Sequence, residues 1–568
     1  MTTLAPRPHK PAAPSLALDQ LPLRPRWTMG RAMLAFVAAA AVVLSLWGVR
    51  RVDLSLFALI DGWPETRNLL ERMLPPRLAA EDRATITRAV FDTFFMAFAG
   101  TSIAMILAVP LAFAAANNVM PLAPVRLVAR GVIVFTRAVP TIVFALVFVR
   151  VFGIGVIPGI LAIGIHSIGM LGKLLADAIE NIDPGPREGV IATGAGSTQE
   201  LLTGVWSQIT PSAISLALYR LEIDFRSAPI LGFVGAGGIG VIMRGYQGNL
   251  RYPELLGVTL LIVVLVIGME MVSTMARRAI LGSEVKQDES SDGSTAPVRR
   301  TGVVAAADVP LEAPWTRDRI KLHVAGWVTI ALFVASFVVP GVSLREFFGS
   351  LGELPGVFWR MVPKDMTWLT DNVVSDLVET VAIGFASTFM ALLVALPLSF
   401  LAASNTAPGR LVYRSTRLLA LLLRAAPDLV IAVILVAAIG LGPAAGSIAL
   451  AIGMIGFSIK LFADNIEEVR PGPRDGVFAT GSTRLQEAAV GVTPQVLPSM
   501  VGNMLYLLDI SLRSSTVLGI VGAGGIGFLL NNAAKTLKFE VMGGIVLCIF
   551  GIVYAIELLA NWIRKQII

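Results

Sequence analysis

Apolar stretches long enough to cross a lipid bilayer recur along the whole sequence of 568 residues. A helix of about 20 residues spans the hydrocarbon core of a bilayer, which is about 30 Å thick. In the first half we expect six such spans, at about residues 33–49, 91–116, 131–152, 157–176, 211–231 and 254–275. Only 15% of the residues are charged, whereas soluble domains contain about 25%. The sequence therefore predicts an all-α polytopic membrane protein and excludes a soluble globular enzyme.

The second half of the sequence repeats the first half at a constant offset of 287 residues. Arg137 recurs as Arg424, and the glycine-rich segment 235–240 recurs as 522–527. No insertion separates these landmarks, and six spans return a chain to the side from which it started. We therefore expect two parallel repeats of about six transmembrane helices each.

These landmarks divide the chain into four parts. We expect a cytosolic N-terminal tail at 1–32, a first membrane repeat at 33–282, a cytosolic linker at 283–319 and a second membrane repeat at 320–568. The tail is basic and rich in proline, without the apolar core of a secretory signal, and the linker has the polar composition of flexible segments. Basic residues are concentrated in the segments that this topology places inside, so both termini are predicted to be cytosolic.

The sequence offers little chemistry for metal or nucleotide binding. Cys548 is the single cysteine, and the three histidines are His9, His166 and His323, so we expect no metal site. The phosphate-binding pattern G-x-x-x-x-G-K-[ST] is absent from the sequence. Any use of ATP must therefore come from a partner protein.

A glycine-rich segment in each repeat matches the dinucleotide-binding pattern G-x-G-x-x-G. Its glycines are Gly235, Gly237 and Gly240 in the first repeat and Gly522, Gly524 and Gly527 in the second. That pattern binds a pyrophosphate only between a strand and a helix, with an acidic residue about 20 positions further on, and neither repeat offers this setting. We interpret these residues as helix-packing or gate glycines at a tight turn.

A polar loop follows the fourth span of each repeat, on the predicted inner side. It reads Asp183-Pro-Gly-Pro-Arg-Glu-Gly-Val-Ile-Ala-Thr-Gly194 in the first repeat and Arg470-Pro-Gly-Pro-Arg-Asp-Gly-Val-Phe-Ala-Thr-Gly481 in the second. Proline ends the span and permits a short helix to begin. With Glu188 six residues ahead of the last glycine, the loop resembles the "EAA" loop of permeases of binding-protein-dependent ABC importers.

Further segments narrow this resemblance. The segment from His166 to Glu180 and the glycine-rich segments look like those of phosphonate-type permeases, and the resemblance covers about 90–280 and about 377–568. It implies the fold of a type I ABC importer permease, with two copies fused in one chain and a coupling helix in each polar loop. The residues implied in ATPase coupling are Arg187, Glu188, Gly189 and Gly194, and Arg474, Asp475, Gly476 and Gly481. A surface helix without a partner is the alternative interpretation of each loop.

The same resemblance implies the partners and the location. It implies two ABC ATPase subunits that use ATP and magnesium, while this chain binds no cofactor and catalyses no covalent reaction. It also implies a periplasmic or lipid-anchored substrate-binding protein, surrounding membrane lipid, and no nucleic acid. The expected location is the bacterial inner membrane, and the expected cargo is a phosphonate or a related phosphorus oxyanion such as phosphate or phosphite.

Ionisable residues inside predicted spans cost about 2.5 kcal/mol or more to insert, so each is a candidate functional residue. The candidates for the substrate pathway are Arg137, Glu222 and Arg226 in the first repeat and Arg424, Asp509 and Arg513 in the second. Glu222 and Arg226 are one helical turn apart, so they suit both an intrahelical ion pair and a place along the pathway. Arginine suits an oxyanion because its planar fork donates two parallel hydrogen bonds.

Two positions near these motifs differ between the repeats. His166 stands where the second repeat has Gly453, and we interpret it as a packing residue rather than a proton relay, which needs a chain of titratable neighbours. Ser207 stands where the second repeat has Pro494, so we expect the first coupling helix to end differently from the second.

The leading hypothesis is therefore the permease of an ATP-driven importer. The alternative is a secondary transporter with two parallel six-helix halves, driven by an ion gradient. The polar loop favours the importer, because a gradient-driven carrier has no need to keep such a loop at the same place in both repeats. A passive channel would use a ring of similar residues rather than pairs of opposite charge.

Overall fold

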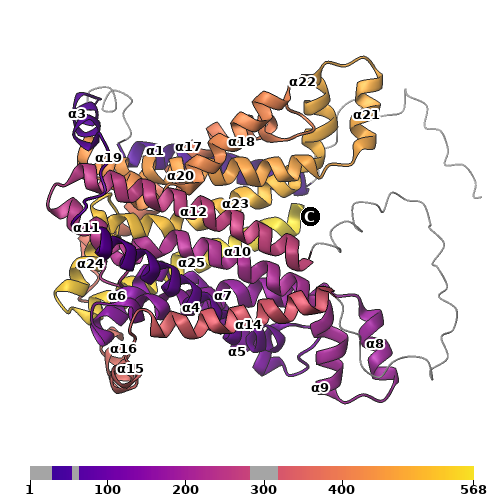
Figure 1. Cartoon of the computed structure of the whole chain (residues 1–568). Coiled ribbons are helices and arrows are strands. Elements are labelled where there is room, and N and C mark those ends of the chain that lie inside the picture. The colour runs from indigo at the N-terminus through magenta and orange to yellow at the C-terminus, as the bar shows by residue number, and fades with distance from the viewer. Residues whose placement is uncertain (1–28, 54–62, 282–316, 568) are drawn as a thin grey trace, which may run out of the picture.

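The computed structural model describes residues 29–53, 63–281 and 317–567 (Figure 1). All the regular elements in these ranges are helices, as the all-α class predicted. Nine of these helices are long and apolar enough to cross a membrane, or up to 11 if each of two bent pairs is one span. Most of the predicted tail and most of the predicted linker lie outside the described residues.

The helices follow the predicted repeat. The first repeat contains α1 (Met29–Arg51), α3 (Trp63–Met73), α4 (Arg83–Ala115), α5 (Ala123–Ala138), α6 (Thr141–Phe152), α7 (Val156–Glu180), α8 (Pro184–Ala192), α9 (Ser197–Gln199), η2 (Glu200–Trp206), α10 (Ser207–Gly232), α11 (Ile239–Gly248) and α12 (Tyr252–Leu281). The second contains α14 (Arg317–Val338), α15 (Leu344–Leu351), α16 (Leu354–Met361), α17 (Asp371–Ala402), α18 (Arg410–Ala425), α19 (Asp428–Ile439), α20 (Pro443–Glu467), α21 (Pro471–Ala479), α22 (Arg484–Gln486), η4 (Glu487–Val492), α23 (Thr493–Leu518), η5 (Gly519–Val521), α24 (Gly527–Lys535) and α25 (Phe539–Ile567). Helices α7 and α20, and α12 and α25, begin 287 residues apart.

The third predicted span, at 131–152, is not one continuous helix but falls on a bent pair of helices. Helices α5 and α6 meet at an angle of 88°, and α18 and α19 meet at 76°. Pro140 and Pro427 stand at the breaks, because proline has no N–H for the helical ladder and drives the preceding residue into extended backbone. Val139 and Ala426 accordingly have ψ angles of 124° and 126°. Each repeat thus contains a bent pair of helices at this place.

Small residues bring the helices of each half into close contact. Helix α4 packs along α7, and a Cβ on Gly100 would lie 2.6 Å from Ile163 Cγ2. A Cβ on Gly159 would lie 1.9 Å from Met96 Sδ. Helices α17 and α20 form the equivalent pair in the second half. Such packing holds membrane helices together, because lipid tails remove the hydrophobic driving force between them.

The first helix of each repeat packs against the other half. Helix α1 contacts α17, where a Cβ on Gly48 would lie 2.8 Å from the carbonyl oxygen of Ala382. Helix α14 contacts α4, and the short helix α3 contacts α19. The two halves are therefore interlocked and do not form separate bundles.

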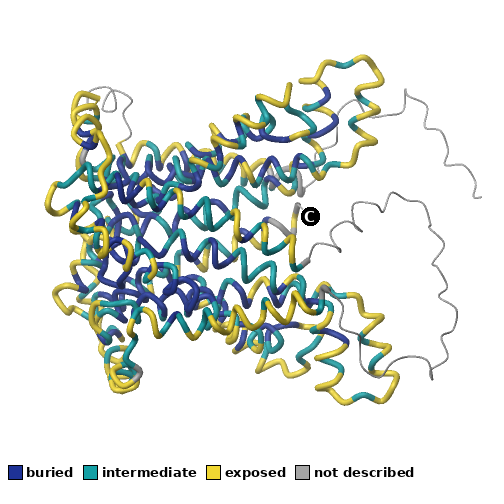
Figure 2. The backbone as a smooth tube through the Cα atoms, viewed as in Figure 1, coloured by how far each residue is buried: buried dark blue, intermediate teal, exposed yellow. Residues whose placement is uncertain are grey.

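The two ends of the bundle differ. Helices α8, α9, α21 and α22 project at one end, which is also the end where the chain finishes, whereas α3, α15 and α16 lie at the opposite end (Figure 1). Buried residues are concentrated toward the end that holds α6, α11 and α24, and the arms that carry α8 and α21 are largely exposed (Figure 2). The two polar loops thus lie at the same end, as parallel repeats require.

Each glycine-rich segment forms a tight turn between two helices, α10 and α11 in the first half. Gly235 and Gly237 have φ angles of +94° and +78°, a region that favours glycine. The N–H of Gly155 donates to the carbonyl oxygen of Gly235 at 3.1 Å, which ties the turn to the start of α7. A Cβ on Gly240 would lie 1.8 Å from the carbonyl oxygen of Pro229. The same geometry recurs at Gly522, Gly524 and Gly527.

We expect Gly240→Ala to destabilise the protein. The added Cβ meets backbone that cannot rotate away, and overpacking of this kind costs on the order of 2 kcal/mol. The matched control is Gly245→Ala on the same helix, because Gly245 is exposed and a Cβ there would meet nothing within 4 Å. Thermal unfolding of the detergent-purified variants measures the difference. Equal unfolding midpoints for the two variants would contradict the packing role.

Candidate functional site

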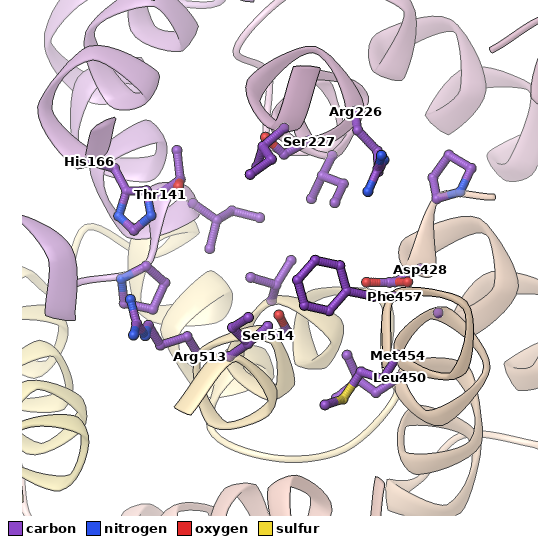
Figure 3. A pocket seen from close by; sticks show the side chains of 18 of the residues that line it. Thr141, His166, Arg226, Ser227, Asp428, Leu450, Met454, Phe457, Arg513 and Ser514 are labelled. Atoms are coloured by element: carbon purple, nitrogen blue, oxygen red, sulfur yellow. The ribbon is translucent and has the colours of Figure 1, made fainter. Parts of the chain in front are cut away.

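A cavity of about 280 Å³ lies between the two halves (Figure 3). Residues of α10 and α23 line it from opposite sides, and residues of α6, α7, α19 and α20 complete the wall. Most of the lining is apolar, with a small number of polar groups, which is typical of ligand sites. The charged and histidine side chains in the lining are His166, Arg220, Arg226, Arg424, Asp428 and Arg513.

Two of the cavity arginines occupy equivalent positions in α10 and α23. Arg226 Nη2 lies 3.3 Å from Glu222 Oε1, and Arg513 forms an ion pair with Asp509. In each pair the partners are one helical turn apart, so the carboxylate neutralises the guanidinium within its own helix. The arrangement therefore combines intrahelical pairing with a place in the cavity wall.

Arg220 has no counterpart in the second half, where Leu507 stands. Arg220 Nη2 lies 2.8 Å from Asp224 Oδ1, and Arg220 Nε donates to Ser167 Oγ at 2.8 Å. The hydroxyls of Ser167 and Thr101 donate to Asp224 Oδ2 at 2.8 and 2.9 Å. This buried network holds Arg220 at the cavity wall, because its guanidinium is paired with the Ser167 hydroxyl and with the Asp224 carboxylate.

Two further ion pairs cross from one half to the other. Arg137 at the end of α5 pairs with Glu557 of α25, and Arg424 at the end of α18 pairs with Glu270 of α12. The two glutamates are 287 residues apart, so the pairs are equivalent under the repeat. Arg513 adds a crossing contact, because its Nη1 donates to the carbonyl oxygen of Arg137 at 3.0 Å. The sequence interpretation missed both glutamates, although each is an acidic residue inside the last span of its repeat.

The structure gathers the six charged residues predicted for the substrate pathway at the interface between the halves. Three of them line the cavity, namely Arg226, Arg424 and Arg513. The other three pair with charged groups beside it, namely Arg137, Glu222 and Asp509. Glu222 forms ion pairs with an arginine of each half. Its Oε1 lies 3.3 Å from Arg226 Nη2 and 3.8 Å from Arg424 Nη2.

The short helices of the polar loops, α8 and α21, have the same geometry. Each has nine residues and is followed within two positions by a glycine in left-handed backbone, Gly194 at φ +80° and Gly481 at φ +79°. The expectation that the first of these helices ends differently is therefore wrong. The reason is that Ser207 and Pro494 lie at the start of the next long helix and not in the loop.

Ion pairs fix each loop against the segment that follows it. Arg187 Nε lies 2.6 Å from Glu200 Oε1, and Arg474 pairs with Glu487 at the equivalent place. The other predicted coupling residues are exposed, namely Glu188, Gly189, Gly194, Asp475, Gly476 and Gly481. Each short helix also exposes an apolar side chain that the sequence interpretation missed, and these two residues, Ile191 and Phe478, are equivalent under the repeat.

Comparison with known proteins identifies the family. Residues 108–281 and 395–568 each match the family described as binding-protein-dependent transport system inner membrane component. The chain belongs to this family. It is 43% identical over 528 residues to the phosphate-import permease protein PhnE of Mycolicibacterium smegmatis, and the match covers 93% of each chain.

Two shorter relatives each span part of this permease. The phosphite transport system permease protein PtxC of Stutzerimonas stutzeri is 37% identical over 43% of this chain and 86% of its own length. The putative cryptic phosphonate transport system permease protein PhnE2 of Escherichia coli is 44% identical over 21% of this chain and 97% of its own length. Since the family match occurs once in each half, the predicted resemblance and the duplication are both confirmed.

We expect the cross-half ion pairs to stabilise the folded permease. Glu557→Gln removes the carboxylate that neutralises Arg137, and breaking a buried pair costs about 3 kcal/mol. The charge exchange Arg137→Glu with Glu557→Arg should be more stable than either single reversal. The control is Arg67→Gln, which disrupts the exposed pair with Glu71 and should change little. Thermal unfolding midpoints measure the effects, and equal midpoints for Glu557→Gln and Arg67→Gln would refute the role.

Proposed function

We propose that this permease forms the membrane passage of an ATP-driven importer for phosphonates or related phosphorus oxyanions, including phosphate and phosphite. The observation that carries the proposal is the cavity between the halves, which Arg226, Arg424 and Arg513 line. Guanidinium groups bind tetrahedral oxyanions through paired hydrogen bonds and keep their charge when desolvated. The names of the relatives, which refer to phosphate, phosphite and phosphonate, support the same cargo class.

In this proposal two ABC ATPase subunits dock on α8 and α21, and these subunits bind the ATP and the magnesium. The permease itself holds no cofactor and catalyses no covalent reaction. The matched geometry of the two loops supports two equivalent docking sites, as do the exposed side chains of Ile191 and Phe478. A periplasmic or lipid-anchored substrate-binding protein delivers the cargo at the opposite end, so α8, α21 and both termini face the cytosol of a bacterial inner membrane.

Short connections link the docking loops, which contain α8 and α21, to the helices that line the cavity. A movement of these loops therefore also moves the cavity wall. The pair of Arg187 and Glu200 fixes α8 to the π-helical turn η2, which continues into α10. Helix α10 carries Arg226, and the same connection in the second half links α21 to Arg513 on α23. When the ATPase subunits close, the two arms approach each other and the cavity walls move with them.

The alternative is a secondary transporter with two parallel six-helix halves, driven by an ion gradient. The two exposed loops of equal geometry favour the importer, because a gradient-driven carrier has no motor to dock there. The deciding assay uses liposomes that contain the permease, its ATPase subunits and its binding protein. We expect uptake of radiolabelled phosphate with ATP and none without it, whereas gradient-driven uptake without nucleotide would establish the alternative.

In this assay, the double variant Gly194→Val with Gly481→Val should uncouple ATP hydrolysis from transport. Valine is strained in left-handed backbone, so the turn that follows each docking helix must change. We expect uptake to fall by about tenfold or more, the scale of a coupling free energy, while the protein still inserts and hydrolysis continues. The control is Gly131→Ala on α5, an exposed position where a Cβ would meet nothing within 4 Å. Undiminished ATP-driven uptake in the double variant would remove the coupling role.

Replacing the equivalent arginines of the cavity, Arg226→Gln and Arg513→Gln, should weaken oxyanion transport. A hydrogen bond to a charged group contributes about 1.5–3 kcal/mol, so we expect roughly a tenfold loss of uptake for each variant. Arg226→Lys keeps the charge without the planar fork and should be intermediate. The control is Arg414→Gln, an exposed position on α18. Unchanged uptake kinetics would assign Arg226 and Arg513 a structural role only.

A further inference from the structure

The two halves differ in one matched pair of cavity residues. The first half has Thr141 and His166 where the second half has Asp428 and Gly453. The Asp428 carboxylate occupies space that only glycine leaves open, because a Cβ on Gly453 would lie 1.8 Å from Asp428 Oδ1. In the first half the His166 ring stands at the corresponding place, and its Nδ1 lies 3.1 Å from the carbonyl oxygen of Val139. The exchange therefore puts a carboxylate at one end of the cavity and a histidine at the other (Figure 3).

Asp428 differs from the other carboxylates at the interface because, among the described residues, it forms no close ion pair with an arginine. Each of the four arginines in the cavity lining already has a carboxylate partner. Among the described residues, the Asp428 side chain has no hydrogen-bond donor and no ion-pair partner. It is partly exposed and lines the cavity (Figure 3). Its position at the first residue of α19 favours its negative charge through the helix dipole.

A carboxylate whose oxygens accept no hydrogen bond from the protein distinguishes anions that carry a hydrogen-bond donor from anions that carry none. An oxyanion whose oxygens carry no hydrogen, such as sulfate, would place one acceptor against another and add like-charge repulsion. An oxyanion that carries a donor, either a P–OH or an ammonium group, satisfies Asp428 while its other oxygens reach the arginines. A site built to hydrogen-bond a substrate group rejects an analogue that lacks the group, because the buried partner is left unsatisfied.

We propose that Asp428 is a specificity-determining residue of the passage, which accepts a hydrogen bond from the cargo. The passage then takes phosphorus oxyanions that carry a P–OH or an ammonium group and rejects fully deprotonated oxyanions of the same size and charge. This inference rests on the proposed function, since it requires the oxyanion to occupy the cavity.

The test measures anion binding to the purified full-length permease in detergent, without the binding protein, so that its selectivity does not contribute. The probes are inorganic phosphate, 2-aminoethylphosphonate and sulfate at mildly alkaline pH, where phosphate keeps one P–OH and the phosphonate donates only through its ammonium group. Binding is followed with radiolabelled anions at equilibrium. We expect phosphate to bind at least about tenfold tighter than sulfate. We expect 2-aminoethylphosphonate also to bind at least about tenfold tighter than sulfate, because its ammonium group donates the hydrogen bond that Asp428 accepts.

Two variants locate this selectivity. Asp428→Asn replaces an acceptor with an amide that also donates, so sulfate binding should improve and the preference for phosphate should fall by about tenfold. The double variant Asp428→Thr with Gly453→His reproduces the pair found at Thr141 and His166, a combination that already packs in the first half, and should lose the preference as well. It serves as the second test if Asp428→Asn does not fold.

The outcomes separate the inference from the function on which it rests. Equal affinities for sulfate and phosphate in the wild type, or a preference that survives both variants, would overturn the role of Asp428 and leave the oxyanion passage in place. Failure of the wild type to bind any of the three anions, together with no ATP-driven phosphate uptake in liposomes, would overturn both proposals.

Discussion

A charge within a membrane protein is costly unless an opposite charge lies beside it, and this constraint organises the contact between the two halves. Arg137 and Arg424 lie where a helix stops ahead of a proline, and their carboxylate partners come from the last helix of the opposite repeat. Each half thus completes the charge balance of the other. Helices α1 and α14, which pack on the opposite halves, add apolar contact to the same interface. The cavity exists because both halves meet around it.

The fold was predictable because hydropathy reports burial in lipid along the chain, and a constant offset relates the two repeats. Hydropathy does not report the direction of the backbone. The sequence therefore predicted one span across Pro140, where the structure has two helices that meet at an angle. Helix geometry links positions i and i+4, which made the pair of Glu222 and Arg226 visible. No local rule joins Arg137 to Glu557, which are 420 positions apart. Contacts between the halves are therefore the part of the site that sequence reasoning missed.

Fusion of two repeats in one chain permits the cavity to lose its two-fold symmetry. In a pair of identical copies a carboxylate at the position of Asp428 would occur twice, and the cavity would gain two negative charges among its arginines. The fused chain carries one such carboxylate and leaves Thr141 at the equivalent position. The same freedom permits Arg220 in one half and Leu507 in the other. A cargo with one donor and several acceptor oxygens matches a cavity whose ends differ.

The two regions of the permease differ in how closely the repeats agree. At the docking loops the glycine backbone angles and the ion pairs are the same in both halves, at +80° for Gly194 and +79° for Gly481. In the cavity wall, the first half contributes His166 where the second half contributes Gly453. The two equivalent ATPase subunits proposed above would require equal docking sites, whereas an oxyanion without two-fold symmetry would contact the two walls differently. A pair of identical ATPase subunits would favour loops that stay the same in both repeats. A cargo without two-fold symmetry would favour cavity residues that differ between the repeats.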